Sequence, residues 1–105
     1  MFERLDSIVD RYDEIERALT QPDLNANELR RLSKEHAELE EIVISFRRYR
    51  ELGDQLQGAK EMLNENDDEI RTMAKMEIAE IEQELEGLTE SLVLLMLPKD
   101  PNDAR

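Results

Sequence analysis

Apolar residues in the last third of the chain recur at alternating steps of four and three residues, from residue 74 to residue 95. This spacing places them on one face of an α-helix as a continuous seam, as in helices that pack against one another. Glutamates fill many of the positions between them, so the other faces of the helix favour water. The pattern predicts that a partner helix buries the seam, which consists of Ala74, Ile78, Ile81, Leu85, Leu88, Leu92 and Leu95.

Two amphipathic stripes upstream can supply that partner. The first has apolar residues at three- and four-residue steps and predicts a helix over about residues 2–20. It ends before Pro22, because proline disfavours the helical conformation of the preceding residue. The second stripe predicts a longer helix, over about residues 26–64. The residues that we expect it to add to the buried seam are Leu32, Leu39, Val43 and Phe46.

The second helix has a clear start and one uncertain stretch. Asn25 and Glu28 have the three-residue offset of a reciprocal capping pair, and Asn27 is an equally good cap. Gly53 and Gly58 lie inside the stripe, where glycine weakens a helix by roughly 1 kcal/mol relative to alanine. The sequence leaves open whether either glycine bends the helix.

A polar segment, residues 64–68, separates the second and third helices. Its asparagines and aspartates favour hydrogen bonds to their own backbone over a continued helix, so we expect a tight turn. Asn66 or Asp67 is expected to cap the third helix, which then runs over about residues 67–97 and ends before Pro98.

A short turn between two long helices predicts that they fold back antiparallel. We therefore predict an all-α fold: a three-helix bundle dominated by a long antiparallel helical hairpin, with the shorter N-terminal helix packed on it. In this interpretation residues 1–97 form one helical domain. Residues 98–105 contain two prolines and no apolar periodicity, and are interpreted as a linker.

The chain is strongly acidic, with 27 Asp and Glu residues against 14 Lys and Arg residues and a formal net charge of -13 over 105 residues. Such a surface repels phosphate backbones, so we expect little direct nucleic-acid binding and a protein partner instead. No apolar run approaches the roughly 20 residues of a membrane-spanning helix, and the N-terminus lacks a signal-peptide pattern. Together with the absence of cysteine, this leads us to expect a soluble cytoplasmic protein without membrane contact.

The residues give little support for an active site or a bound metal. A di-metal carboxylate bundle needs two Glu-x-x-His motifs, and His36, the one histidine, lies on an apolar stripe as a packed imidazole would. Asn64, Asn66 and Asp68 match the start of a calcium loop, but Glu69 stands where that loop needs glycine. A slim bundle also has little room for a pocket that could activate a carboxylate. We predict no catalytic residue, no metal and no cofactor.

Two further groups have a structural and a functional interpretation. The only basic cluster consists of Arg47, Arg48 and Arg50 beside Tyr49. It could contact RNA, but a salt-bridged helix face is the simpler interpretation in an acidic chain.

Flexible methionines commonly fill gaps in a core. We interpret the internal methionines as such residues of the core or its rim, namely Met62, Met73, Met76 and Met96.

Three segments resemble the N-terminal domain of the bacterial release factor 1 family, the class-I translation termination factors that read UAG and UAA. They are residues 29–39 (LRRLSKEHAEL), 69–74 (EIRTMA) and 94–103 (LLMLPKDPND). The last segment is the most specific, because in that family it directly precedes the core of the factor. The similarity covers essentially the whole chain.

The resemblance implies a factor that enters the ribosome at a stop codon and triggers hydrolysis of peptidyl-tRNA. Neither the Pro-x-Thr type tripeptide that reads the codon nor the hydrolytic Gly-Gly-Gln motif of the family occurs in these residues. The segment is therefore expected to be non-catalytic and to precede the domains that carry those motifs. In the family it faces the GTPase-associated region of the ribosome with its stalk-base protein, and it influences recycling by a partner GTPase release factor.

The residues by themselves leave other interpretations open. A free-standing acidic coiled-coil adaptor would use leftover apolar seam to self-associate. A concentration-dependent dimer without ribosome affinity in the longer protein would favour that adaptor. A helical carboxylate enzyme is the third interpretation, and it would require a stoichiometric metal.

Overall fold

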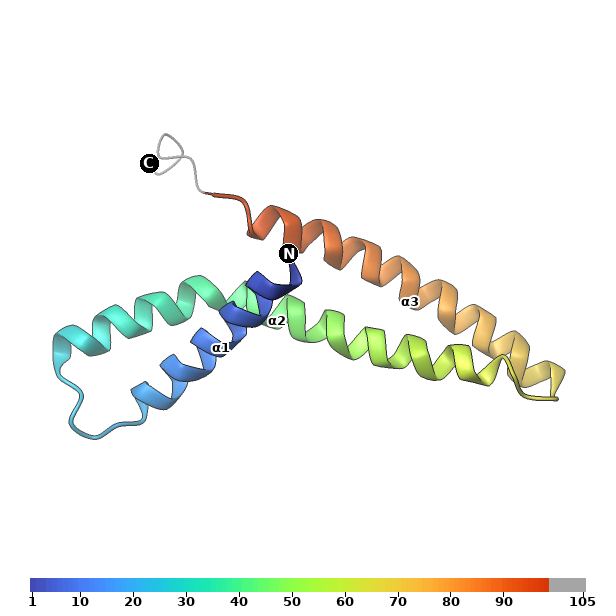
Figure 1. Ribbon diagram of the computed structural model, residues 1–105, viewed down its shortest axis with the longest axis horizontal. Helices are drawn as coiled ribbons and strands as arrows, with labels where there is room; N and C mark the ends of the chain where they lie inside the picture. The colour runs from blue at the N-terminus through green and yellow to red at the C-terminus, as the bar shows by residue number, and fades with distance from the viewer. Residues whose placement is uncertain (99–105) are drawn as a thin grey trace. The chain divides into compact units, whose positions relative to one another are not determined.

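The computed structural model describes residues 1–98, and within them the chain forms three α-helices and no strand (Figure 1). Helix α1 spans Phe2–Leu19, α2 spans Ala26–Met62 and α3 spans Asp68–Leu95. The predicted all-α class is confirmed. The chain divides into two compact units, residues 1–44 and residues from 45 onward, so α2 contributes to both. The predicted linker begins at Pro98, and its residues 99–105 lie outside the described part of the chain.

The observed helices end within two residues of the expected bounds. Helix α2 ends at Met62 because the next residues form a tighter turn: the N–H of Leu63 donates to the carbonyl of Lys60 at 3.2 Å, three residues back. Within α2, Gly53 and Gly58 both adopt helical backbone, and the helix is continuous through them.

In the first unit, α1 packs on the first part of α2 through an apolar face and one aromatic pair. The rings of Tyr12 on α1 and His36 on α2 stack, with centroids 4.2 Å apart. The Nε2 atom of His36 lies 3.5 Å from a carboxylate oxygen of Glu16. The expected role of this histidine as a packed residue agrees with these contacts. The side chains of α1 that are buried are Leu5, Val9, Tyr12 and Ile15.

An exposed ion pair joins the same two helices. The guanidinium of Arg11 donates to both carboxylate oxygens of Glu35, at 2.6 Å from Nε and 2.8 Å from Nη2. This hydrogen-bonded contact lowers the pKa of the Glu35 carboxyl and raises the pKa of Arg11. Because the pair is solvent-exposed, it orients the two helices more than it stabilises them.

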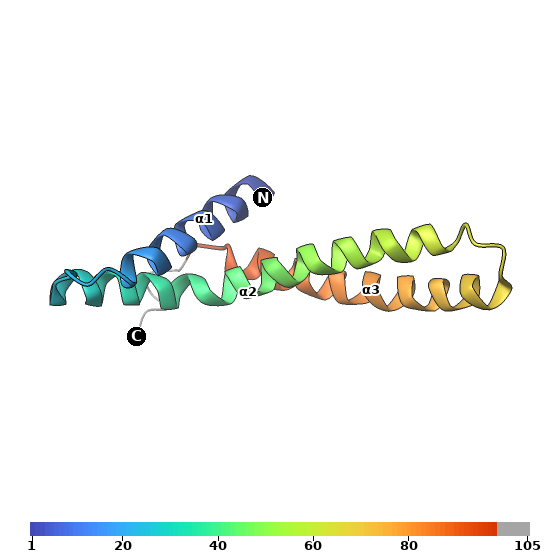
Figure 2. The same ribbon diagram turned by 90° about the horizontal axis from the view of Figure 1, so that it is seen from below.

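In the second unit, α3 lies antiparallel beside the second part of α2, as two perpendicular views show (Figures 1 and 2). Arg48 of α2 donates to Glu84 of α3, with Nε 2.8 Å from Oε2, while Met62 of α2 lines the same pocket as Ile70 of α3. Residue numbers therefore rise along one helix as they fall along the other. This arrangement is the predicted hairpin.

The residues expected to form the apolar seam are all at least partly buried. Burial of a complete leucine or isoleucine side chain is worth about 1.5–3 kcal/mol, so the fully buried members stabilise the fold most. The buried members are Leu32, Val43, Phe46, Ala74, Ile81 and Leu92. The half-buried members are Leu39, Ile78, Leu85, Leu88 and Leu95.

Side-chain caps define where α2 and α3 begin. Asn25 accepts the backbone N–H of Glu28 at 2.8 Å and donates to the Glu28 carboxylate at 3.0 Å, which makes it, and not Asn27, the cap of α2. Asp67 accepts the backbone N–H of Glu69 at 2.8 Å and caps α3. These side chains pair backbone N–H groups that have no partner within the helix.

Among the described residues, no polar or charged side chain is buried. The same part of the chain contains no group of three or more histidines, cysteines, aspartates or glutamates that could hold a metal ion. None of its helices combines the length and the apolarity that crossing a membrane requires.

Candidate docking surface

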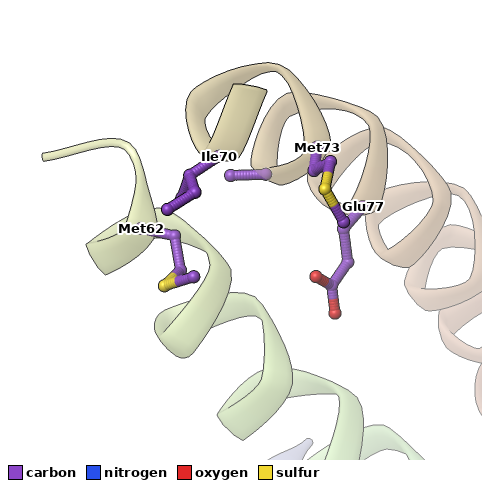
Figure 3. A pocket seen from close by; sticks show the side chains of 5 residues that line it. Met62, Ile70, Met73 and Glu77 are labelled. Atoms are coloured by element: carbon purple, nitrogen blue, oxygen red, sulfur yellow. The ribbon is translucent and has the colours of Figure 1, made fainter. Parts of the chain in front are cut away.

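The closed end of the α2–α3 hairpin exposes three methionines. Met62 on α2 is 45% exposed, and Met73 and Met76 on α3 are 69% and 63% exposed. Met62, Met73 and the half-buried Ile70 line one pocket (Figure 3), and Met76 lies three residues after Met73 on α3. We call these four residues the hairpin-end surface. An exposed cluster of flexible, polarizable methionines is typical of surfaces that bind protein partners.

The turn before α3 holds this surface in place. The side chain of Arg71 donates to the backbone carbonyl of Glu65 in the turn and pairs with Asp68 in the first turn of α3. With Asp67 as the cap, these contacts fix the start of the helix. Because successive residues of a helix are about 100° apart, Met73 and Met76 are neighbours on α3, with Met73 about 100° and Met76 about 160° around the helix from the seam position Ala74.

A shallow pocket of about 130 Å³ opens between the two helices at this end. Its lining consists of Met62, Ile70, Met73, Ala74 and Glu77 (Figure 3). Because the seam carries the small Ala74 here, space remains beneath the larger side chains. Sites for small molecules usually measure about 300–1,000 Å³, so this hollow suits a single apolar side chain of a partner better than a free ligand.

The sequence around the hairpin-end surface is predominantly acidic. Residues 60–80 contain three basic residues, and one of them, Arg71, is paired with Asp68. An apolar contact area with acidic surroundings favours a partner that presents an apolar side chain among basic residues. The acidic residues of this stretch are Glu61, Glu65, Asp67, Asp68, Glu69, Glu77 and Glu80.

Comparison with known proteins assigns this helical chain to a family. The PCRF domain matches residues 8–105. The chain belongs to the PCRF domain family. No solved structure matches the chain.

Curated relatives of this PCRF domain agree with the assignment. Peptide chain release factor 1 of Bacillus licheniformis is 45% identical over 106 residues, which cover 98% of this chain and 30% of the relative. The corresponding factor of Acidobacterium capsulatum is 45% identical over 107 residues, covering 100% of this chain and 30% of the relative. That of Geobacillus kaustophilus is 44% identical over 108 residues, with the same coverage. The resemblance to release factor 1 is therefore confirmed, and the PCRF domain spans less than a third of these relatives.

The basic cluster of the PCRF domain is engaged in helix contacts. Arg48 pairs with Glu84 on α3 and, at 3.1 Å, with Glu51 on its own helix, and its pKa is raised by these carboxylates. The guanidinium of Arg50 lies over the ring of Phe46, 4.4 Å from its centroid. These contacts support the interpretation as a salt-bridged helix face.

The sequence predicts that the four internal methionines of the PCRF domain lie in the core or at its rim, and for three of them the core is excluded. Met62, Met73 and Met76 are exposed, and only Met96 is half-buried. The sequence carried a signal for this outcome, because Met73 and Met76 lie beside the seam positions and not on them. The hairpin-end surface was not predicted, because methionine was interpreted by its usual role in cores and not by its position on the helix.

Proposed function

We propose that this chain is the non-catalytic domain of a release factor that directs translation termination in the cytoplasm at UAG and UAA codons. Its similarity to release factor 1 over nearly its whole length supports this role. Two further observations support a binding role for the domain itself. Three exposed methionines lie at the closed end of the hairpin, and Val93, Leu94 and Leu97 are exposed at the other end of α3.

In this proposal the domain positions the factor on the ribosome near the GTPase-associated region. The observation that supports a specific contact is the hairpin-end surface, where three methionines are 45–69% exposed within an acidic stretch. Proteins that coat RNA carry basic surfaces, so the stalk-base protein has the complementary chemistry. The domain acts as a monomer and makes little direct contact with nucleic acid, since its net charge is -13.

The recycling GTPase release factor is the second partner that we propose. A domain beside the GTPase-associated region would lie close to the place where such a GTPase binds. The hairpin would then affect how long the factor stays on the ribosome, which is separate from the hydrolysis of peptidyl-tRNA.

The proposal can be tested on the full-length factor with the double variant Met73→Asp/Met76→Asp. Peptide release is measured at rising factor concentration on ribosomes programmed with UAA, UAG or UGA. We expect release on UAA and UAG and none above background on UGA. The double variant should raise KM by about tenfold, which corresponds to a loss of roughly 1.4 kcal/mol of binding free energy. The value of kcat should be unchanged, because the lost contact binds the ground state and the transition state equally.

Leu29→Asp is the matched control, because Leu29 is also an exposed apolar residue, at 47%, but lies in the first unit at the start of α2. It should leave KM unchanged. Equal KM values for the double variant and the unmodified factor would refute a docking role for the hairpin end. A full-length protein that dimerises and does not bind ribosomes would instead support the adaptor interpretation.

A further inference from the structure

The last turn of α3 exposes a second apolar group, far along the helix from the hairpin end. Val93 is 46% exposed, Leu94 is 68% exposed and Leu97, just after the helix, is 57% exposed. We call these three residues the α3 C-terminal face. Residues 91–98 contain no charged side chain, in contrast to the glutamate-rich outer positions earlier in α3.

The three residues form one contiguous surface. Val93 and Leu94 are adjacent in the last turn of α3, and Leu97 lies in the turn that follows the helix. The backbone N–H of Leu97 donates to the carbonyl of Leu94 at 3.3 Å, which keeps it in a tight turn at the helix end. Leu92 has no exposed area and serves the seam, so the face is additional to the residues that the hairpin needs for its own core.

The position of this face in the longer protein indicates what covers it. The chain spans 30% of relatives such as release factor 1 of Bacillus licheniformis, and as their N-terminal domain it precedes most of their length. In such a protein the chain leaves α3 directly beside the face. In those relatives the rest of the protein follows this end of α3 in the same chain. Surfaces on neighbouring domains of one chain meet at a high effective concentration, so a modest apolar patch is sufficient for docking.

We propose that the α3 C-terminal face is the docking site for the domain that follows in the full-length protein. The contact holds the PCRF domain against that domain, and an apolar side chain of the following domain is its counterpart. This inference rests on the family membership and does not depend on where the hairpin end binds, since the two surfaces lie at opposite ends of α3.

Cysteine accessibility in the full-length protein tests the proposal. Leu94→Cys reports on the face, and Met76→Cys is the matched control, because both residues are more than 60% exposed on the same helix. The native protein, free of ribosomes, is treated with a maleimide, and labelling is followed by mass spectrometry on the peptide that carries the introduced cysteine. We expect the cysteine at position 94 to react about tenfold more slowly than the one at position 76, and both to react equally in urea. Leu97→Cys should behave like Leu94→Cys.

Three outcomes are informative. Slow labelling that does not depend on protein concentration supports docking within one chain. Equal rates at positions 94 and 76 overturn the proposal, because the face is then open in the complete protein. Slow labelling that appears only at high protein concentration also overturns it, because a second copy of the protein then covers the face. A failure of ribosome docking would change none of these rates.

Discussion

Helices α1 and α3 use their apolar residues differently. Of the large apolar residues on α1, only Phe2, at its first position, is exposed. On α3 four are exposed: Met73, Met76, Val93 and Leu94. Both helices carry a face that packs on α2, but α3 carries more apolar surface than that packing uses.

This difference separates residues that build the fold from residues that are available to partners. The surplus on α3 is concentrated at its two ends, while its middle follows the seam with glutamates outside it. Large exposed apolar groups on a small protein usually mark interaction sites. The comparison supports a stabilising role for α1 and the binding roles that we propose for the ends of α3.

The largest expected effect comes from placing a charge in the middle of the seam. Ile81 is 5% exposed, so Ile81→Asp buries an unpaired carboxylate and should lower the free energy of unfolding by more than about 4 kcal/mol. Urea unfolding followed by circular dichroism measures the change. Met76→Asp, five residues earlier on the same helix, should shift the free energy of unfolding by no more than about 0.5 kcal/mol. Similar losses for the two variants would contradict the division between seam and surface.

The smallest effect concerns the ion pair between α1 and α2. Arg11 lowers the pKa of Glu35 in the folded protein below its ordinary value of 4.5, so the carboxylate stabilises the fold above that pH and loses the effect as the pH falls through the lowered pKa. Glu35→Gln should thus be slightly less stable than the unmodified chain at neutral pH, and the difference should vanish in acid. Melting temperatures across this pH range test it, with Glu86→Gln on α3 as the charge-matched control. A difference that grows on acidification would refute the assigned role of the pair.

Much of the fold could be predicted from the sequence because it depends on local patterns. The alternating spacing from Ala74 to Leu95 locates α3, and the three-residue offset of Asn25 and Glu28 locates the start of α2. The exact cap of α3 remained open, because Asn66 and Asp67 are chemically equivalent until the backbone geometry of the turn is known. The structure resolves this choice in favour of Asp67.

The docking surfaces were harder to predict because exposure depends on what the neighbouring helix covers. Met62 is the last residue of α2, and its side chain is left 45% exposed. Leu94 lies off the seam positions Leu92 and Leu95, but its place off the seam does not show how much of its side chain the neighbouring helix covers. The exposure of each side chain depends on how α2 and α3 are aligned along each other. The pairing of Arg48 with Glu84 shows this alignment.

The central claim is that the hairpin end contacts the ribosome, and methionine oxidation tests it without any substitution. The full-length factor, alone or bound to stop-programmed ribosomes, is exposed briefly to an oxidant, and sulfoxide formation is measured by mass spectrometry. Met1, 49% exposed in the first unit, serves as the internal control. We predict that ribosomes slow the oxidation of Met62, Met73 and Met76 and leave that of Met1 unchanged. Equal oxidation of the three residues in the free and bound factor would contradict the account.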